Sequence, residues 1–436
     1  MSEKITIFWF RRDLRFEDNI GLYAALEDAH PVLPLFIFDE EILDTLPTND
    51  PRVTFIYNRV QQMRTQLTEE YSSTLAIYHG KPKEIFKQLI HEFKVHQVIT
   101  NRDYEPYAIH RDKEIGSYLK SQNVAFNTYK DQVIFEENEI VKSDGNPYLV
   151  YTPYKNKWQA QFKDKENLLE SSSEKYLKNL VRDHNLSHIS LSDMGFTASN
   201  IEVPDYTLDP HLIQNYEETR DYPYIEEGTS KLGPHLRFGT ISIRTVMKKA
   251  IAEENHVFWS ELIWREFFMQ ILYHFPHTVT DTFKPNYDRI VWRNNEKEFD
   301  KWKKGETGYE LVDAGMRELN ATGFMHNRVR MLVASFLCKH LLIDWRWGEA
   351  YFAEKLLDYE MSSNIGNWQW AAGSGVDAAP YFRIFNPNTQ ADKFDKERKY
   401  INKWIPNIDE STYPDKMVNH KEARERCLKV YKEALR

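Results

Sequence analysis

A predicted helix near residues 258–275 carries three side chains that could hold a flat ligand. Glu261, Trp264 and Arg265 are spaced i, i+3 and i+4, so they share one helix face. A carboxylate beside an indole ring can accept hydrogen bonds from a heterocycle while the ring stacks on it. The same spacing also fits an amphipathic helix with a buried Trp and a surface ion pair. This helix alone leaves both interpretations open.

The segment Asp358–Asn388 contains the densest group of aromatic and amide side chains. Asn364, Gly366, Trp368 and Trp370 fall within seven residues. Two Trp with Gly and Asn around them are poor core design, but they suit a flat aromatic cofactor. Glycine permits close approach, and an amide can bond a ring nitrogen. Structural packing of Trp in a helical core is the alternative.

A third group could bind a phosphate. Thr229, Ser230 and Lys231 precede a helical stretch. Hydroxyls, free backbone N–H groups and one Lys at a helix start suit a phosphate or pyrophosphate. An ordinary N-cap is the simpler interpretation of these residues.

A further helix places Asn327 and Met331, four residues apart, on one face. Its arginines, Arg328 and Arg330, point elsewhere. Taken alone, this pattern favours a core Met and solvated arginines.

The elements that position these groups are of two kinds. In the first 130 residues, short apolar stretches alternate with helical patterns, which predicts βαβ units in a doubly wound, Rossmann-like parallel sheet. Strands are predicted at Ile5–Phe10, Val32–Phe38, Leu75–Tyr78, Val95–Thr100 and Val124–Thr128. Helices are predicted at Ile20–Ala29, Thr54–Tyr71, Pro82–Lys94 and Ile109–Ser121. No GxGxxG follows the first strand, so the usual dinucleotide cradle is absent there.

The predicted organisation is an α/β domain over residues 1–130, a linker over 131–205 and an all-helical domain over 206–436. Ser, Pro and scattered charges predict that the linker is a long connection over the surface. After Asp205 nearly everything fits helices, with Gly and Pro at their ends.

Composition excludes several classes of protein. A net charge of −9 over 436 residues argues against general affinity for nucleic acid, so any such site must be a local patch. Two cysteines, Cys338 and Cys427, favour a reducing, cytoplasmic location. The stretch Met331–Trp347, the longest apolar helix candidate, is broken by Lys339 and Asp344, which excludes a membrane span. No His, Cys or Asp cluster has the spacing of metal ligands.

These segments together resemble the DNA photolyase/cryptochrome family over nearly the whole chain, and most of all the bacterial class I cyclobutane pyrimidine dimer photolyases. The motifs that carry the resemblance are Trp9–Arg15 with Asp18 and Asn19, Gly228–Leu232, Glu261–Phe267, Gly323–Met331 and Asn364–Pro387. The resemblance implies FAD, fully reduced, in the helical domain. Blue light would excite the flavin, an electron would pass to the dimer, the cyclobutane ring would split, and the electron would return.

The resemblance also implies roles for particular residues. Those implied to bind FAD are Tyr216, Thr229, Ser230, Lys231, Leu232, Gly233, Arg330, Asp358, Glu360 and Asn364. Those implied to contact the flipped-out dimer are Glu261, Trp264, Asn327, Met331 and Trp370. A chain of Trp292, Trp345 and Trp368 would carry electrons from the surface to photo-oxidised flavin. Those implied to lie near the DNA backbone are Arg220, Arg265, Arg328, Arg383 and Gln390.

Some positions depart from the family pattern. In the phosphate cradle, Lys231 replaces an Arg and Gly233 replaces a Ser. Beside Glu261, Ser260 stands where an Asn is common. The stretch 103–108 lacks the Asn-Glu pair with which related enzymes hold a folate antenna. Folate is therefore disfavoured as a second chromophore, and a deazaflavin, a second flavin or no antenna remain open.

The residues disfavour rival functions, including a dark flavin oxidoreductase, for which there is no nicotinamide-type glycine motif and no evident general-base histidine. A six-four photoproduct photolyase would have His at the positions of Asn327 and Met331, which this chain lacks. A cryptochrome-type blue-light sensor would bind FAD without repairing DNA, but the implied dimer contacts are all in place. The expected partner is UV-damaged DNA, and a monomer fits a chain that supplies its whole cofactor pocket.

Overall fold

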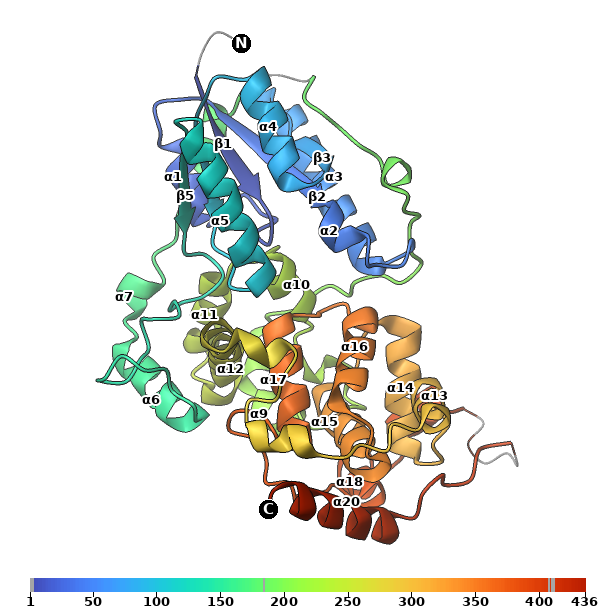
Figure 1. Cartoon of the computed structure of the whole chain (residues 1–436). Helices are drawn as coiled ribbons and strands as arrows, with labels where there is room; N and C mark the ends of the chain where they lie inside the picture. Colours follow the sequence, from blue (N-terminus) through green and yellow to red (C-terminus); the bar gives the residue numbers. More distant parts are fainter. Residues whose placement is uncertain (1–3, 183–184, 407, 409–411) are drawn as a thin grey trace. The chain divides into compact units, whose positions relative to one another are not determined.

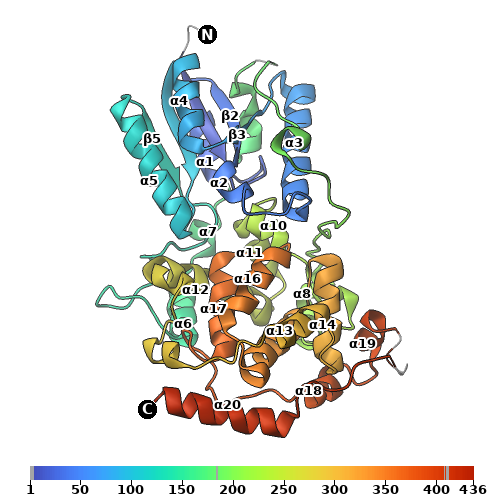
Figure 2. The same ribbon diagram turned by 45° about the vertical axis from the view of Figure 1, so that its right-hand side comes forward.

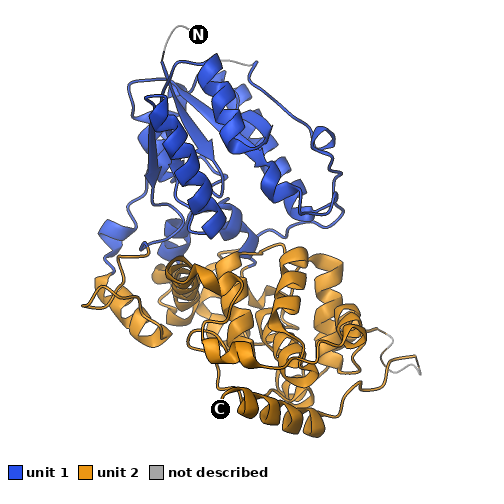
Figure 3. Ribbon diagram, viewed as in Figure 1, with its two compact units in different colours: residues 1–136, 162–206, 231–249 blue, residues 137–161, 207–230, 250–436 orange. Residues whose placement is uncertain are grey.

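The computed structural model describes residues 4–182, 185–406, 408 and 412–436. The chain forms two compact units, shown in Figure 3. The first comprises residues 1–136, 162–206 and 231–249, and the second comprises residues 137–161, 207–230 and 250–436. The predicted linker over 131–205 is thus divided between the units, with residues 137–161 in the second unit and the rest in the first. Residues 231–249 of the predicted helical domain group with the first unit. The predicted domain limits stay a prediction.

The first unit contains a five-stranded parallel sheet with strand order β3-β2-β1-β4-β5 (Figures 1 and 2). Its strands are β1 (Ile5–Phe10), β2 (Val32–Asp39), β3 (Ala76–Gly80), β4 (Val95–Asn101) and β5 (Ala125–Tyr129). In register, Thr6 of β1 lies between Val32 and Gln97. The strand order reverses between β1 and β4, which confirms the predicted doubly wound sheet.

Helices cover both faces of this sheet. The helices α1 (Ile20–Leu26) and α3 (Pro51–Tyr71) pack on one face, and α4 (Pro82–Glu92) and α5 (Pro106–Ser121) on the other. Successive β1 side chains serve the two faces in turn, because Phe8 joins the first core and Trp9 the second. Every β1 residue is buried, as expected for a central parallel strand. Other elements here are α2 (Glu40–Leu43), α7 (Asp164–Asn167), η1 (Ser173–Asn179), η2 (Ser192–Met194) and α10 (Gly233–Phe238).

A buried ion network joins distant segments of the first unit. Arg15 and Arg244 share the carboxylate of Asp131 at 2.8 and 2.9 Å, and Arg244 also binds Asp18 at 2.9 Å. Burial alone would raise the pKa of Asp131, but the two guanidinium charges lower it below its ordinary value. The carboxylate therefore stays ionised and links the loop after β1 to the segments after β5 and α10.

The second unit is helical. Besides α6 (Tyr151–Gln161), its elements are α8 (Pro210–Gln214), α9 (Tyr216–Thr219), η3 (Glu226–Gly228), α12 (His256–His274), η4 (Pro276–Val279), η5 (Pro285–Arg289), α13 (Glu296–Lys304), α14 (Glu310–Thr322), α15 (Asn327–Ser335), η6 (Phe336–Leu341), α16 (Trp345–Lys355), α17 (Met361–Ala372), α18 (Pro387–Phe394), α19 (Lys399–Trp404) and α20 (His420–Ala434). The helix α11 (Ile243–Ala252) crosses from the first unit into it. Within the described residues, no helix has the length and apolar character that crossing a membrane requires.

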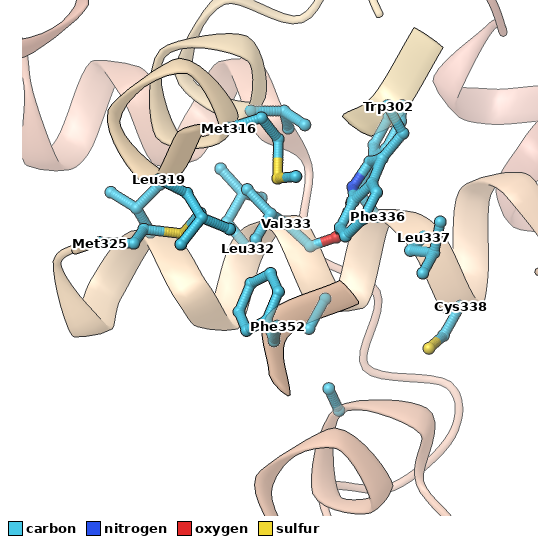
Figure 4. Packing of buried hydrophobic residues seen from close by; sticks show 14 of the residues in the cluster. Trp302, Met316, Leu319, Met325, Leu332, Val333, Phe336, Leu337, Cys338 and Phe352 are labelled. Carbon is cyan, nitrogen blue, oxygen red and sulfur yellow. Dashed lines mark hydrogen bonds between the residues drawn. The ribbon is translucent and has the colours of Figure 1, made fainter. Parts of the chain in front are cut away.

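The core of this unit surrounds α15 and the π-helical turn η6 that continues it. Figure 4 shows Leu332, Val333 and Phe336 packed beside Trp302 of α13 and Phe352 of α16. The expected apolar helix over Met331–Trp347 is thus divided among α15, η6 and α16. The Lys and Asp inside it do not prevent burial.

The helix α6 lies in the stretch that was expected to be a loose surface connection. Its Tyr151, Tyr154 and Trp158 are buried. Trp158 Nε1 donates to the Glu266 carboxylate of α12 at 2.6 Å. The i, i+3, i+7 spacing of these aromatic residues is a helical signal that the sequence analysis overlooked.

Two glycines set the position of α17. A Cβ on Gly366 would lie 2.3 Å from the Phe268 ring of α12. A Cβ on Gly348 of α16 would lie 2.1 Å from the Trp368 ring of α17. Because both distances are far below contact, only glycine allows α12, α17 and α16 to pack this closely.

We expect Gly366→Ala to destabilise the protein by about 1–3 kcal/mol, because the clash with the Phe268 ring outweighs the better helix propensity of Ala. Thermal unfolding followed by tryptophan fluorescence measures the effect. Gly116→Ala in α5 is the matched control, since its Cβ would lie 3.1 Å from the Phe126 ring. Equal unfolding temperatures for both variants would contradict the packing argument.

Lys339 of η6 is a lysine inside the core. Its side chain is 1% exposed, and Nζ donates to the backbone oxygen of Arg383 at 2.8 Å. Burial lowers the pKa of Lys339 to about 8. Between that pH and the ordinary lysine pKa, the unfolded chain binds the extra proton, so stability rises with pH there.

A Lys339→Met variant should lack this rise. The difference in unfolding free energy between wild type and variant should shift in favour of the wild type by on the order of 1–3 kcal/mol from pH about 7 to about 10. Chemical denaturation at the two pH values measures it, with the exposed Lys297→Met as control. A difference that does not change with pH would show that Lys339 keeps an ordinary pKa.

Candidate active site

One cavity in the helical unit brings predicted cofactor and substrate residues together. It is lined by α15, α16, α17 and the turn that precedes α17. The predicted site residues that line it are Asn327, Arg330, Met331, Asp358, Glu360, Asn364, Trp368 and Trp370. Residues far apart in the sequence therefore converge on one cavity.

On one wall, Arg330 and Asp358 form a bidentate ion pair. The two nitrogen–oxygen distances are 3.1 and 2.9 Å, and Arg330 Nε also donates to the backbone oxygen of Met325 at 2.7 Å. The third bond fixes the plane of the guanidinium group, so the pair is rigid. A planar, charged pair of this kind fits the polar edge of a flavin ring, as the resemblance implies.

Asn364 of α17 is held by Glu349 of α16. The Asn364 amide nitrogen donates to the Glu349 carboxylate at 2.9 Å and to the Glu349 backbone oxygen at 3.1 Å. Burial raises the pKa of Glu349, while the bond from Asn364 opposes the rise. Both amide hydrogens point to Glu349, so the Asn364 oxygen is the atom left to accept a hydrogen bond from a ligand. Glu349 was not predicted from the sequence, because no motif surrounds it.

Glu261 and Trp264 of α12 are not among the residues that line this cavity, and each is held by a residue from another segment. Glu261 pairs with Arg220 at 2.5 Å, and the Trp264 ring stacks on Tyr151. Burial raises the pKa of Glu261 although the Arg220 charge lowers it. Arg265 lies 3.5 Å from Glu360, which lines the cavity, so this contact joins α12 to the cavity wall.

One of two unpartnered buried hydroxyls supports a ligand in this unit. Thr229 Oγ1 and Ser362 Oγ are buried and lack a hydrogen-bond partner within the described residues. Buried hydroxyls are normally bonded, so Thr229 fits the ribityl or phosphate groups of FAD, whereas Ser362 lines a separate, mostly apolar pocket between α12 and α17. Tyr216 lies 5.5 Å beneath the Arg220 guanidinium, and the Ser230 backbone oxygen accepts from Thr207 at 2.9 Å.

The other three predicted phosphate contacts belong to the first unit. Lys231 has a left-handed backbone with φ of 56°. Leu232 is buried at the start of α10, and Gly233 is its exposed first residue. Their role stays a prediction.

The three predicted electron-transfer tryptophans do not touch one another ring to ring in the described part of the chain. The buried Trp368 contacts the rings of Phe352 at 5.0 Å and Trp302 at 6.2 Å. The buried Trp345 lies under the Arg346 guanidinium at 4.8 Å, and Trp292 meets Tyr431 at 6.1 Å. Transfer along them would need steps longer than direct ring contact.

The predicted DNA-contacting arginines are largely paired with acidic neighbours. As described above, Arg220 and Arg265 each bind a glutamate, and Arg328 binds Asp221 at 2.5 Å and lies 4.4 Å above Phe394. Arg383 is exposed, and the structure records no ion pair for it in the part it describes. Gln390 is half-buried in α18. The local basic patch is therefore partly neutralised.

Comparisons with known proteins identify the family. The family described as DNA photolyase matches residues 6–174, and its FAD binding domain matches residues 258–412. A deoxyribodipyrimidine photo-lyase of Halobacterium salinarum is 36% identical, over 98% of this chain and 99% of its own length. The chain belongs to the DNA photolyase family.

Other photolyases are similar along their full length. The deoxyribodipyrimidine photo-lyase of Escherichia coli is 33% identical over 98% of both chains. A bacterial class III photolyase from Agrobacterium tumefaciens superposes with a TM-score of 0.89 at 33% identity, covering 100% of this chain and 98% of its own. An archaeal photolyase from Sulfolobus tokodaii, solved with two FAD molecules, gives 0.81 at 33% identity over 98% and 99%. Since a class III structure is this similar, class I membership stays a prediction.

In this photolyase, Glu349→Leu should loosen the Asn364 amide, because it removes the carboxylate acceptor and leaves only the backbone oxygen of residue 349. Losing one oriented hydrogen bond to the flavin is worth about 1 kcal/mol, so reduced flavin should reoxidise in the dark about five times faster. Stopped-flow absorbance of the FAD-loaded protein measures the rate. Glu349→Gln, which keeps the size and a hydrogen-bonding group, is the control. A wild-type reoxidation rate in Glu349→Leu would show that the amide needs no such support.

Proposed function

We propose that this chain is a deoxyribodipyrimidine photo-lyase that uses blue light to repair cyclobutane pyrimidine dimers in UV-damaged DNA. The observation that carries the proposal is the single cavity at which Asn327, Met331 and Trp370 adjoin Arg330, Asp358 and Asn364. Electron transfer requires the flavin and the dimer to be neighbours, and this cavity puts their predicted contacts on shared walls. The photo-lyase relatives support the same reaction.

The residues of this chain would hold the cofactor in a fixed electrostatic setting. When bound, fully reduced FAD excited by blue light would supply the electron that splits the cyclobutane ring and would take it back afterwards. The Arg330–Asp358 pair would orient the isoalloxazine ring, and the Asn364 oxygen would accept the hydrogen at N5. Thr229 Oγ1 would hydrogen-bond to the ribityl group, which joins the isoalloxazine ring to the phosphates. Buried side chains such as Trp368 keep water from the cavity wall.

The cavity and the neighbouring helix α12 would together bind the dimer outside the DNA helix. A dimer already stacks badly, so flipping it out costs only a few kcal/mol. The rings of Trp264 and Trp370 would recover that cost by stacking. Glu261 and Asn327 would hydrogen-bond the pyrimidine edges, and Met331 would pack on the ring. For Glu261 to bind the dimer, its ion pair with Arg220 would have to weaken or break. The guanidinium of Arg220 could then bind a DNA phosphate.

A cytoplasmic monomer acting on damaged DNA fits the cysteine usage and the prediction that one chain supplies all the FAD contacts. A second flavin as antenna is supported by the archaeal photolyase solved with two FAD molecules. The intact set of dimer contacts favours repair over a purely sensory role.

Light-dependent repair of a thymine-dimer oligonucleotide by the photoreduced protein tests the function. Intact thymine absorbance should recover only under blue light. Glu261→Ala should lower the repair rate at limiting substrate about ten-fold or more, because a hydrogen bond to a charged group contributes about 1.5–3 kcal/mol. Glu296→Ala, at an exposed site at the start of α13, is the control. Full repair by Glu261→Ala would refute the assignment of Glu261 to the substrate site. Absence of repair by the FAD-loaded wild type would favour the cryptochrome-type blue-light sensor instead.

A further inference from the structure

Tyr151 lies flat on the ring of Trp264. The two ring centroids are 3.6 Å apart, and the ring planes differ by 8°. Tyr151 is the first residue of α6, more than a hundred positions before Trp264. Nothing in the motif around Trp264 indicates this contact.

The tyrosine is anchored at both ends. Its hydroxyl donates to the backbone oxygen of Ser260 at 2.8 Å, and its backbone N–H donates to the Asp377 carboxylate at 3.0 Å. Burial raises the pKa of Tyr151 above its ordinary value, so the hydroxyl stays a donor at any working pH. The ring is 7% exposed and meets Phe267 edge-on at 5.9 Å. A side chain held in this way is a fixed wall rather than a loose cover.

Because Tyr151 covers one face of the Trp264 indole, only part of that ring can contact a substrate. One face of the indole is covered by Tyr151, and Phe267 lies against it at 5.6 Å with planes at 80°. Phe268 lies 5.5 Å away at 27°, a centroid distance too long to cover a second face fully. The half-buried Trp264 therefore keeps only its remaining face and edge open.

We propose that Tyr151 is a positioning residue for dimer recognition. It holds Trp264 in one orientation, so that the indole surface left open is already formed when the dimer arrives. A Trp free to change rotamer would lose that freedom on binding, which weakens binding. The proposal rests on the proposed function, since it assigns Tyr151 to the substrate side of the same site. Undamaged DNA, whose bases stay stacked in the duplex, makes no use of the indole.

The test compares dark binding of two oligonucleotides, one with a single thymine dimer and one undamaged, by the FAD-loaded protein. Tyr151→Ala should weaken dimer binding about ten-fold, with undamaged binding and FAD content close to wild type, at a temperature well below the lowered unfolding transition that loss of a buried ring causes. Tyr151→Phe keeps the stacked ring and should restore most of the affinity. Val150→Ala, at the exposed neighbouring position, is the control.

A double-mutant cycle separates this role from general destabilisation. In a Trp264→Ala background, Tyr151→Ala should cause no further loss of dimer affinity, because the group that it positions is gone. A further ten-fold loss there, an equal loss for both oligonucleotides, or tighter dimer binding by Tyr151→Ala would each overturn the proposal. If the wild type itself does not distinguish the oligonucleotides while binding FAD, the proposed function fails, and the role of Tyr151 fails with it.

Discussion

The close contact of α17 with α12 and α16 is the constraint on which the site depends. Gly366 and Gly348 admit the rings of Phe268 and Trp368 where any side chain would collide. Since α17 carries predicted cofactor contacts and α12 carries predicted dimer contacts, these glycines set the distance between the two sets. Electron transfer falls steeply with distance, so the packing of three helices governs the chemistry more directly than any single polar residue.

The charge arrangement fits an enzyme that recognises damage rather than DNA in general. Three of the arginines expected near DNA are already paired with Glu261, Glu360 and Asp221. Their charges are compensated, in keeping with a chain of net charge −9. Binding would exchange internal partners for phosphates, which gives little net electrostatic gain on undamaged duplex. Selectivity must then come from the aromatic cavity that receives a flipped base.

Much of this arrangement could be predicted from sequence, and the failures have physical causes. The parallel sheet follows from apolar stretches such as Ile5–Phe10, and local motifs mark residues such as Asn364. Contacts between distant segments leave no local pattern, so Glu349 behind Asn364 and Tyr151 behind Trp264 were missed. The helix α6 was not predicted because Pro147 before it and Pro153 in its first turn indicated a loop, although its aromatic spacing was helical. Ring contacts among tryptophans depend on rotamers, which sequence does not define.

The order of the segments along the chain has a consequence for synthesis. The helix α6 packs on α12, yet His256, where α12 begins, follows Gln161 by 95 residues. At about 5–20 residues per second, the ribosome needs roughly 5–20 s to make that stretch. During this time the helix that buries Tyr154 and Trp158 does not yet exist, so both aromatic side chains remain exposed on the nascent chain. Chaperones that recognise exposed aromatic side chains would therefore bind this protein during synthesis, before its helical unit can fold.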